Sequence, residues 1–403
     1  MRILPIASGK GGVGKTTLAL NLALTLAKTH RTVLMDMDTG TSSLRNFLAV
    51  PVQKDLFHFL KKECPLEQCR QFLPPSMDPD QAFANFSFIA APGGFISDIV
   101  NMDAPTKAKL VQGLNSLSAD YVILDLKAGL DTGVLDFLPI SNSGIILFTP
   151  GQRAATLAAA QTAKAVLFRM LNIMLDAPRI REKFFPAGGQ PEPLLLRLRD
   201  FLRNGRDPEG KNLDDFIHAA EAAFPQENFF RVFRYYVENY RVYYILNKFN
   251  SIAESVESAI QPFVENMFRT VSARVTFHNL GWVVEHNEIR QSSESGVPYL
   301  VRRHYQKKQL PALGNDDDLR SRFGLAAKKQ QPQKERALNE ELRDQVDLLR
   351  QIYICNAGND PLTNLGFIAA RIREFSANSN HQFGMKHIYS EKEFVERFQA
   401  RIL

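Results

Sequence analysis

The segment between residues 9 and 17 constrains the fold of this chain more than any other feature. It follows an apolar run at residues 2–8, precedes an amphipathic stretch at residues 16–28, and reads Gly9-Lys10-Gly11-Gly12-Val13-Gly14-Lys15-Thr16-Thr17. A glycine-rich loop between a strand and a helix directs backbone N–H groups and the positive end of the helix dipole at phosphate oxygens. The pattern G-x-x-x-x-G-K-[ST] therefore predicts a phosphate-binding loop, or P-loop.

Each polar residue of this loop has an expected partner on a bound nucleotide. We expect the Lys15 ammonium to contact the β- and γ-phosphates of ATP, the Thr16 hydroxyl to ligate Mg²⁺, and Thr17 to lie near the α-phosphate. The remaining contacts are expected from the rest of the loop, at Gly11, Gly12, Val13 and Gly14. A chance match to the motif is the weaker alternative, because a strand pattern precedes it and a helix pattern follows it.

The first 150 residues alternate short apolar runs with helical patterns. This alternation predicts an α/β protein with a P-loop NTPase fold, in which a mostly parallel, twisted sheet is flanked by helices. Strands are expected at residues 2–8, 32–37, 87–91, 121–126 and 145–148, and helices at residues 16–28, 105–117 and 154–175. The pattern returns with a strand at residues 241–249, a helix at 251–270 and a strand at 275–284.

Composition and breaker residues divide the chain into four parts. We expect an ATPase domain built from residues 1–175 and 240–305, with a helical insertion at residues 176–239. Residues 306–336 carry charged and polar runs typical of a linker, and residues 337–403 form a C-terminal helical extension. The insertion is rich in aromatic residues at helical spacing, which favours a packed core over a partner-binding surface: Phe184, Phe185, Phe201, Phe216, Phe224, Phe229, Phe230, Tyr235 and Tyr236.

Composition excludes several classes of protein. Three cysteines, without a C-x-x-C pair, indicate neither a disulfide framework nor a zinc site. No stretch approaches the roughly 20 apolar residues that span a bilayer, and the N-terminus lacks the pattern of a secretory signal. We therefore expect a cytoplasmic protein. A net charge of +6 permits contact with nucleic acid or an anionic membrane but does not indicate it.

Lys10 makes the resemblance to a known family specific. With this second lysine, the loop resembles that of the deviant Walker-A ATPases, the MinD/ParA family, which includes MinD-like flagellar-number regulators. In that family the lysine acts like an arginine finger and neutralises phosphate charge across an ATP-sandwich dimer, and we expect the same of Lys10. A solvated loop lysine is the alternative. The resemblance covers about residues 1–175 and 240–303.

Three acidic residues match the family in order along the chain. The resemblance implies that Asp38 orients the attacking water, that Asp36 supports the Mg²⁺ shell, and that Asp125, in a Walker B strand, holds Mg²⁺ through water. Helix capping is the alternative for these carboxylates. Lys127, two residues after Asp125, departs from the family pattern, and it either alters hydrolysis and partner contact or points into solvent.

Two further segments match the part of the family that binds adenine. Asn247 ends a strand where the family has an adenine-contacting asparagine, and a side-chain amide suits adenine because it both donates and accepts. Residues 280–298 resemble the closing element of the family. The usual proline of that element is replaced by Val284, which departs from the pattern of the adenine loop.

The resemblance implies a nucleotide-switched regulator of spatial positioning or partitioning. Such a protein would dimerise with ATP, hydrolyse it in a Mg²⁺-dependent and partner-stimulated reaction, and bind a protein activator or cargo. A metabolic ligase of the dethiobiotin synthetase or cobyrinic acid amidase type is the main alternative. An iron–sulfur carrier is a third, but Cys64, Cys69 and Cys355 lie outside the usual position of its cysteine pair.

The surface on which such a regulator would act is open at this stage. Lysines and arginines at residues 302–308 and 328–334 could contact DNA phosphates, although a solvated linker is the favoured explanation. Ser390 and Glu393 form a capping box that opens a C-terminal amphipathic helix. Its mixed charges suit an anionic bilayer poorly, so docking onto the protein body is favoured over membrane binding.

Overall fold

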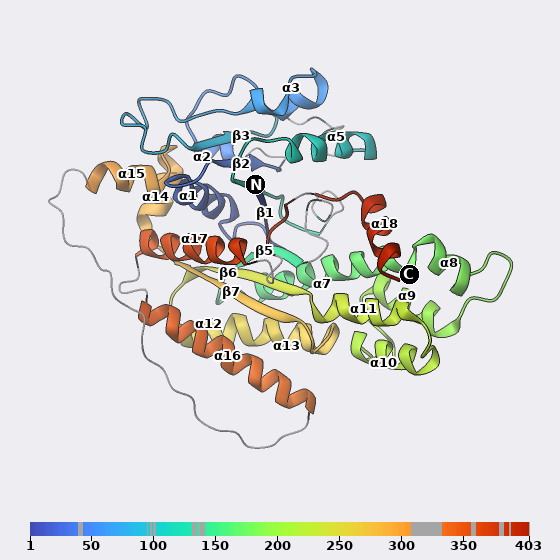
Figure 1. The fold of residues 1–403 in the computed structure, drawn as a ribbon. Coiled ribbons are helices and arrows are strands. Elements are labelled where there is room, and N and C mark those ends of the chain that lie inside the picture. The colour runs from blue at the N-terminus through green and yellow to red at the C-terminus, as the bar shows by residue number, and fades with distance from the viewer. Residues whose placement is uncertain are drawn as a thin grey trace.

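A parallel sheet forms the centre of the molecule (Figure 1). The structure, a computed structural model, describes residues 1–38, 43–94, 96, 99, 102–130, 135, 137, 142–307, 333–355, 360–378, 383–386 and 388–402. Within these residues the sheet has seven strands in the order β3-β2-β4-β1-β5-β6-β7, and every pairing is parallel. The strands are β1 (Arg2–Ala7), β2 (Thr32–Asp36), β3 (Phe86–Ile89), β4 (Tyr121–Asp125), β5 (Asn142–Phe148), β6 (Arg241–Phe249) and β7 (Thr276–Val284).

The predicted α/β fold is confirmed. Strands β2 to β5 are buried along their whole length, as expected when helices cover both faces of a parallel sheet. Helix α1 (Lys15–Ala27) connects β1 to β2, whereas α7 (Arg153–Leu175) connects β5 to β6 in the opposite direction along the sheet. Right-handed crossovers therefore place α1 and α7 on opposite faces. The direction of winding reverses beside β1, where α/β proteins bind ligands at the carboxyl ends of the strands.

Shorter elements cover the rest of the sheet. Helix α5 (Ala104–Asn115) and α3 (Leu56–Lys61) pack together near β3 (Figure 1). The helix expected at residues 251–270 forms in three pieces, α12 (Ile252–Ser255), a π-helical turn η2 (Val256–Ile260) and α13 (Gln261–Thr270). The remaining elements before the C-terminal region are α2 (Ser43–Phe47), a 3₁₀ turn η1 (Leu66–Cys69), α14 (Asn287–Ser295) and α15 (Tyr299–Lys307).

Residues between α7 and β6 form four helices at one end of the molecule (Figure 1). They are α8 (Pro178–Phe184), α9 (Pro193–Asn204), α10 (Leu213–Ala223) and α11 (Asn228–Glu238). Most of their aromatic side chains are buried against one another, and the ring of Phe184 contacts those of Phe224, Phe229 and Phe230. Phe185, Phe224 and Tyr236 are half-buried, and Tyr235 is exposed over 43% of its surface. The aromatic residues thus serve mainly as a core.

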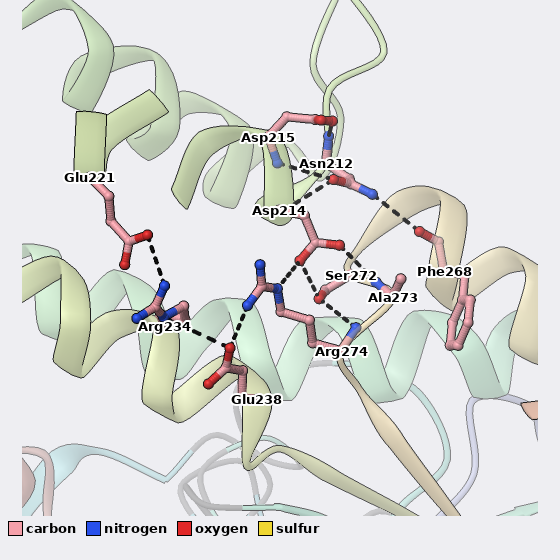
Figure 2. A network of polar contacts seen from close by, with 10 residues as sticks. All are labelled: Asn212, Asp214, Asp215, Glu221, Arg234, Glu238, Phe268, Ser272, Ala273 and Arg274. Atoms are coloured by element: carbon pink, nitrogen blue, oxygen red, sulfur yellow. Dashed lines mark hydrogen bonds and ion pairs between the residues drawn. The ribbon is translucent and has the colours of Figure 1, made fainter. Parts of the chain in front are cut away.

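A network of hydrogen bonds and ion pairs connects these helices to the turn between α13 and β7 (Figure 2). Asp214 accepts hydrogen bonds from the Ser272 hydroxyl at 2.7 Å and the Ala273 N–H at 2.9 Å, and its Oδ1 lies 3.2 Å from Arg274 Nε. The Arg274 guanidinium also donates to Glu238 at the end of α11. One arginine therefore joins α10 and α11 to the main sheet.

The C-terminal helices pack on the sheet rather than apart from it. Helices α16 (Gln333–Cys355) and α17 (Pro361–Ala377) both contact β7, and α17 also lies beside α1 (Figure 1). After α17 the chain reaches β1, where Ile3 and Met385 form an antiparallel bridge with N–H to O distances of 2.7 and 2.8 Å. The linker expected at residues 306–336 lies largely outside the described residues.

The last helix, α18 (Glu391–Ile402), docks onto α11 (Figure 1). Phe398 is fully buried against Phe229, and the ring of Phe394 lies 5.9 Å from that of Tyr236. The Ser390–Glu393 capping box is present at its start. This is the docked arrangement that its mixed charges favoured. None of the helices in the described ranges is long and apolar enough to cross a membrane.

Candidate functional site

The glycine-rich loop turns from the end of β1 into the start of α1 at the centre of the sheet. Two of its glycines lie where a side chain would not fit. A Cβ on Gly9 would lie 2.3 Å from the carbonyl oxygen of Ala158 in α7, and one on Gly14 would lie 2.4 Å from the Asn247 amide nitrogen. Gly14 also has a φ of 85°, in the left-handed region that favours glycine. Close packing therefore holds the loop against α7 and β6.

Lys15 and Asp125 form a buried ion pair beneath this loop. Lys15 is the first residue of α1 and is 8% exposed, and its Nζ donates to Asp125 Oδ1 at 2.5 Å. Asp125 ends β4 and is fully buried. Its second oxygen, Oδ2, is buried without a hydrogen-bond partner in the described structure. The lysine is therefore positioned at the loop, and one carboxylate oxygen is left for a further ligand.

Asp36 lies beside Asp125, because the two residues are paired across the parallel strands β2 and β4. Burial, together with the adjacent Asp125 charge, raises the pKa of Asp36 to about 7. Its two oxygens accept backbone N–H groups, Oδ1 from Asp38 at 3.0 Å and Oδ2 from Leu44 at 3.1 Å. Asp36 thus holds both ends of the segment that follows β2, of which residues 39–42 lie outside the described structure.

The residues present at this edge fit a magnesium ion that is shared with phosphate. Thr16, at the start of α1, is 9% exposed, and Asp125 Oδ2 is the oxygen without a partner among the described residues. Both are hard oxygen donors of the kind that Mg²⁺ prefers. No group of three or more His, Cys, Asp or Glu side chains is placed to bind a metal in the part of the chain that the structure describes. A metal here would depend on phosphate and water for its other ligands.

A pocket of about 410 Å³ opens from the loop toward β7. Its near wall is formed by the loop and α1, including Gly12, Gly14 and Thr17. Its far wall comes from α2, the end of β7, α14 and α17. It offers the apolar side chains Phe47, Val283, Val284, Ile289 and Leu365, and the polar or charged side chains Asn46, Glu285, His286, Arg290 and Glu294. A glycine-rich loop at one end, and a wall with both apolar and hydrogen-bonding side chains at the other, suit a nucleotide, whose base has apolar faces and a polar edge.

Asn247 lies at the junction of the loop and the pocket. Its Nδ2 donates to the Val13 carbonyl at 2.7 Å, and the side chain also lines the pocket wall. The contact with adenine that the sequence suggests for Asn247 stays a prediction. The departure from the family at Val284 has a structural counterpart, because the Val284 N–H, which a proline would lack, donates to Asn364 Oδ1 at 3.1 Å. Asn364 lies on α17 and is fully buried.

The structure therefore brings most of the predicted site residues together. Lys15, Thr16, Asp36 and Asp125 meet at the carboxyl edge of the sheet, and Thr17 and Asn247 line the adjoining pocket. Lys10 and Lys127 are exposed, and Asp38 is half-buried.

Sequence reasoning missed the parts of the pocket that come from outside the recognised motifs. Leu365 and Asn364 lie in α17, more than a hundred residues beyond Asn247. The amphipathic pattern of this helix does not indicate which strand or helix it packs against. Phe47 lies on the short helix α2, which sequence analysis did not detect. Lys248, which also lines the pocket, had one available signal, since it follows Asn247 directly.

Proteins that combine such a loop with a parallel sheet of this winding bind nucleotides, and the fold and site place the chain among the P-loop nucleotide-binding proteins. A profile of the CobQ/CobB/MinD/ParA nucleotide-binding domain matches residues 4–396. Because the match spans nearly the whole sequence, the chain belongs to this family.

Individual relatives resemble the chain over a smaller part. The septum site-determining protein MinD of Helicobacter pylori is 30% identical over 153 residues, which are 37% of this chain and 53% of that protein. The flagellum site-determining protein YlxH of the same organism is 29% identical over 159 residues, covering 38% of this chain and 50% of that protein. The chain spans about half the length of the curated relatives it matches.

A solved structure of a MinD protein also aligns with this chain. MinD from Pyrococcus horikoshii OT3, complexed with Mg-ADP, aligns at 17% sequence identity with a TM-score of 0.42, over 74% of this chain and 87% of that chain.

Proposed function

We propose that this protein is a Mg²⁺-dependent ATPase that acts as a nucleotide-switched regulator of spatial positioning or partitioning. The observation that carries the proposal is the buried Lys15–Asp125 pair beneath a glycine-rich loop that opens into a base-sized pocket. Membership of the nucleotide-binding family supports ATP as the ligand. The names of the septum and flagellum site-determining relatives support the role in positioning.

We propose a part for each of these residues in the reaction. Lys15 is held by Asp125, so an incoming phosphate would compete with that carboxylate for the ammonium. Once released, Asp125 would join the Thr16 hydroxyl in holding Mg²⁺, which supplies positive charge to the phosphate oxygens. Asp38 would orient the attacking water, and Asp36, by accepting the Asp38 N–H at 3.0 Å, would keep it in place.

Lys10 is the residue through which a second copy of the chain would act. Its side chain is exposed at the loop, in contrast to the buried Lys15. We propose that it neutralises phosphate charge in the partner subunit of an ATP-dependent dimer, in the way of the deviant Walker-A ATPases. A protein activator or cargo would then be selected by the dimer. We further propose a cytoplasmic location, with a membrane or DNA surface as the place of action.

The proposal is tested by the solution mass of the Asp38→Ala variant, measured by light scattering with Mg-ATP and with Mg-ADP. Slow hydrolysis should preserve the ATP state, so the mass is expected to rise from 45.5 kDa to twice that value with ATP and to stay unchanged with ADP. Lys15→Ala, which should not bind ATP, is the matched control. A monomer under both conditions would reject the switch and favour the metabolic ligase alternative.

A further inference from the structure

Cys64 and Cys69 lie on either side of a short turn that follows α3. Pro65 is the N-cap of the 3₁₀ turn η1, so Cys64 precedes the cap and Cys69 is the last residue of the turn. Apolar side chains at these two positions, the one before the cap and the fourth after it, commonly pack against each other. Cysteine behaves as a small apolar residue in such a contact. Both side chains are free thiols in the described structure.

The two sulfur atoms meet at one backbone oxygen. The Sγ atoms of Cys64 and Cys69 each lie 3.7 Å from the Pro65 carbonyl oxygen, within reach of an S–H hydrogen bond. Burial, and then the neighbouring Cys64 thiol, raise the pKa of Cys69 to about 12. The two thiols are therefore close enough for one to influence the ionisation of the other.

The backbone holds both cysteines in position. Glu63 ends the α3 region with a φ of 54°, in the left-handed region that reverses the direction of the chain. The Cys64 N–H then donates back to the His58 carbonyl at 3.2 Å. Cys69 is fixed by the η1 turn to which it belongs. A covalent bond between the two sulfur atoms would thus close a loop whose ends the fold already holds together.

The two thiols differ in their access to solvent. Cys64 is half-buried and lies between Glu63 and Pro65, which are both exposed, whereas Cys69 is fully buried. Solvent access is one of the properties that decide which thiol an oxidant attacks. An oxidant from solution therefore reaches Cys64 first, and Cys69 is the buried thiol that waits beside it.

We propose that Cys64 and Cys69 form a reversible disulfide in response to peroxide, with Cys64 as the attacking thiol and Cys69 as the resolving thiol. The Cys64 thiolate attacks hydrogen peroxide, the O–O bond breaks, and a sulfenic acid and hydroxide form. The Cys69 sulfur then attacks the Cys64 sulfur. The S–S bond forms, and the sulfenic hydroxyl leaves with the Cys69 proton as water. The two thiols together give two electrons to the peroxide.

This pair lies apart from the candidate nucleotide site. In the described structure neither cysteine lines the pocket that opens from the glycine-rich loop. The inference is therefore independent of the proposed function. In a reducing compartment both residues would remain thiols until an oxidant appears, which is the behaviour of a redox-responsive pair rather than of a structural disulfide.

Peroxide treatment of the reduced 403-residue chain tests the pair. After a brief exposure to hydrogen peroxide, iodoacetamide blocks the remaining thiols, and the digested protein is analysed by mass spectrometry. Cys64 and Cys69 should both lose their reaction with iodoacetamide and appear in a disulfide-linked peptide, and dithiothreitol should restore both thiols. Cys355→Ser is the matched control and should form the same disulfide.

Two single substitutions test the order of the steps. Cys69→Ser lacks the resolving thiol, so Cys64 should persist as a sulfenic acid that dimedone labels. Cys64→Ser lacks the attacking thiol, so Cys69 should stay reduced. Dimedone labelling of Cys69 in Cys64→Ser would overturn the inference. A peroxide-treated wild type without the Cys64–Cys69 disulfide, or with a disulfide that includes Cys355, would overturn it as well, and this result requires no variant to fold.

Discussion

Lys15 and Asp125 depend on each other at the scale of single residues. Both are buried, and the Nζ–Oδ1 distance of 2.5 Å shows a direct charge-assisted contact. Removing one partner of a buried pair leaves the other charge without compensation, which destabilises a protein more than the pair stabilises it. The residue proposed to bind phosphate therefore also supports the fold.

Lys15→Ala should consequently lose both nucleotide binding and stability. We expect the free energy of unfolding to fall by on the order of 3 kcal/mol, because Asp125 remains buried and unpaired. Thermal unfolding and ATP titration measure the two effects. Lys10→Ala is the control: its side chain is exposed, so stability should change by less than about 0.5 kcal/mol and ATP binding should persist. A Lys15→Ala protein as stable as the wild type would show that Asp125 needs no counter-charge.

Asp36 makes the stability of the unliganded protein depend on pH. The folded protein keeps the Asp36 proton until about pH 7, whereas the unfolded chain releases it near the ordinary value of 3.8. Between these pH values the folded state binds more protons than the unfolded chain. The contribution of Asp36 to the free energy of unfolding therefore becomes less favourable as pH rises from about 4 to about 7. Each pKa unit corresponds to about 1.4 kcal/mol.

Asp36→Asn should remove this dependence. Without Mg²⁺ or nucleotide, the difference in unfolding free energy between variant and wild type should grow in favour of the variant as pH rises to 7, and should be constant above it. Urea titrations at several pH values provide the measurement. Parallel pH profiles for the two proteins would show that Asp36 is already ionised in the folded state.

At the scale of elements, the helices between α7 and β6 depend on a few polar contacts as well as on their aromatic core. Asn212 caps α10 and also donates to the Phe268 carbonyl at 3.2 Å, and the Leu213 N–H bonds to the Val271 carbonyl at 2.8 Å. Together with Asp214 and Arg274, these contacts join the start of α10 to the end of α13 (Figure 2). The junction is therefore polar and depends on correct geometry.

Asp214→Ala should loosen this junction. The Asp214 side chain is 14% exposed and accepts hydrogen bonds from Ser272 and Ala273, so its loss leaves buried donors unsatisfied, at a cost of about 1–3 kcal/mol. Thermal unfolding measures the loss. Asp347→Ala is the control, because Asp347 pairs with Arg350 at 3.5 Å where both side chains are 65% exposed. This substitution should change stability by less than about 0.5 kcal/mol. Equal effects of the two substitutions would argue against a structural role for the network.

At the scale of the whole molecule, the C-terminal region belongs to the same core as the sheet. Helices α16 and α17 contact β7, whose Trp282 is fully buried, and Met385 pairs with Ile3 at β1. Helix α17 also supplies Leu365 to the pocket and Asn364 to the Val284 N–H. The C-terminal helices therefore cover one edge of the sheet and also form part of the pocket wall.

A chain that ends at residue 332 should not fold cooperatively. Without α16 and α17, the apolar side chains of β7 that these helices cover would be exposed to water. A chain that ends at residue 388 is the matched control. It lacks only α18, which packs on α11 and α7, so it should keep a single unfolding transition at a lower temperature. Calorimetry distinguishes the two. A cooperative transition in the shorter chain would show that the first 332 residues form an independent domain.

The sequence alone determined the sheet and the end of the site that is proposed to bind phosphate. Buried strands and amphipathic helices have local patterns, and the glycine loop with Lys15, Thr16 and the strand-end Asp36 and Asp125 is defined by local spacing. Parallel strands end at one edge, so the topology brought these residues together as the sequence predicted.

The tertiary structure alone decided the far wall of the pocket and the place of the C-terminal helices. Leu365 and Asn364 reach the pocket because α17 lies against β7, a contact between segments about eighty residues apart. An amphipathic helix shows which face is apolar but not which surface covers it. The β-bulge at Lys248 in β6 likewise arises from the register between two strands, which no single segment of the sequence contains.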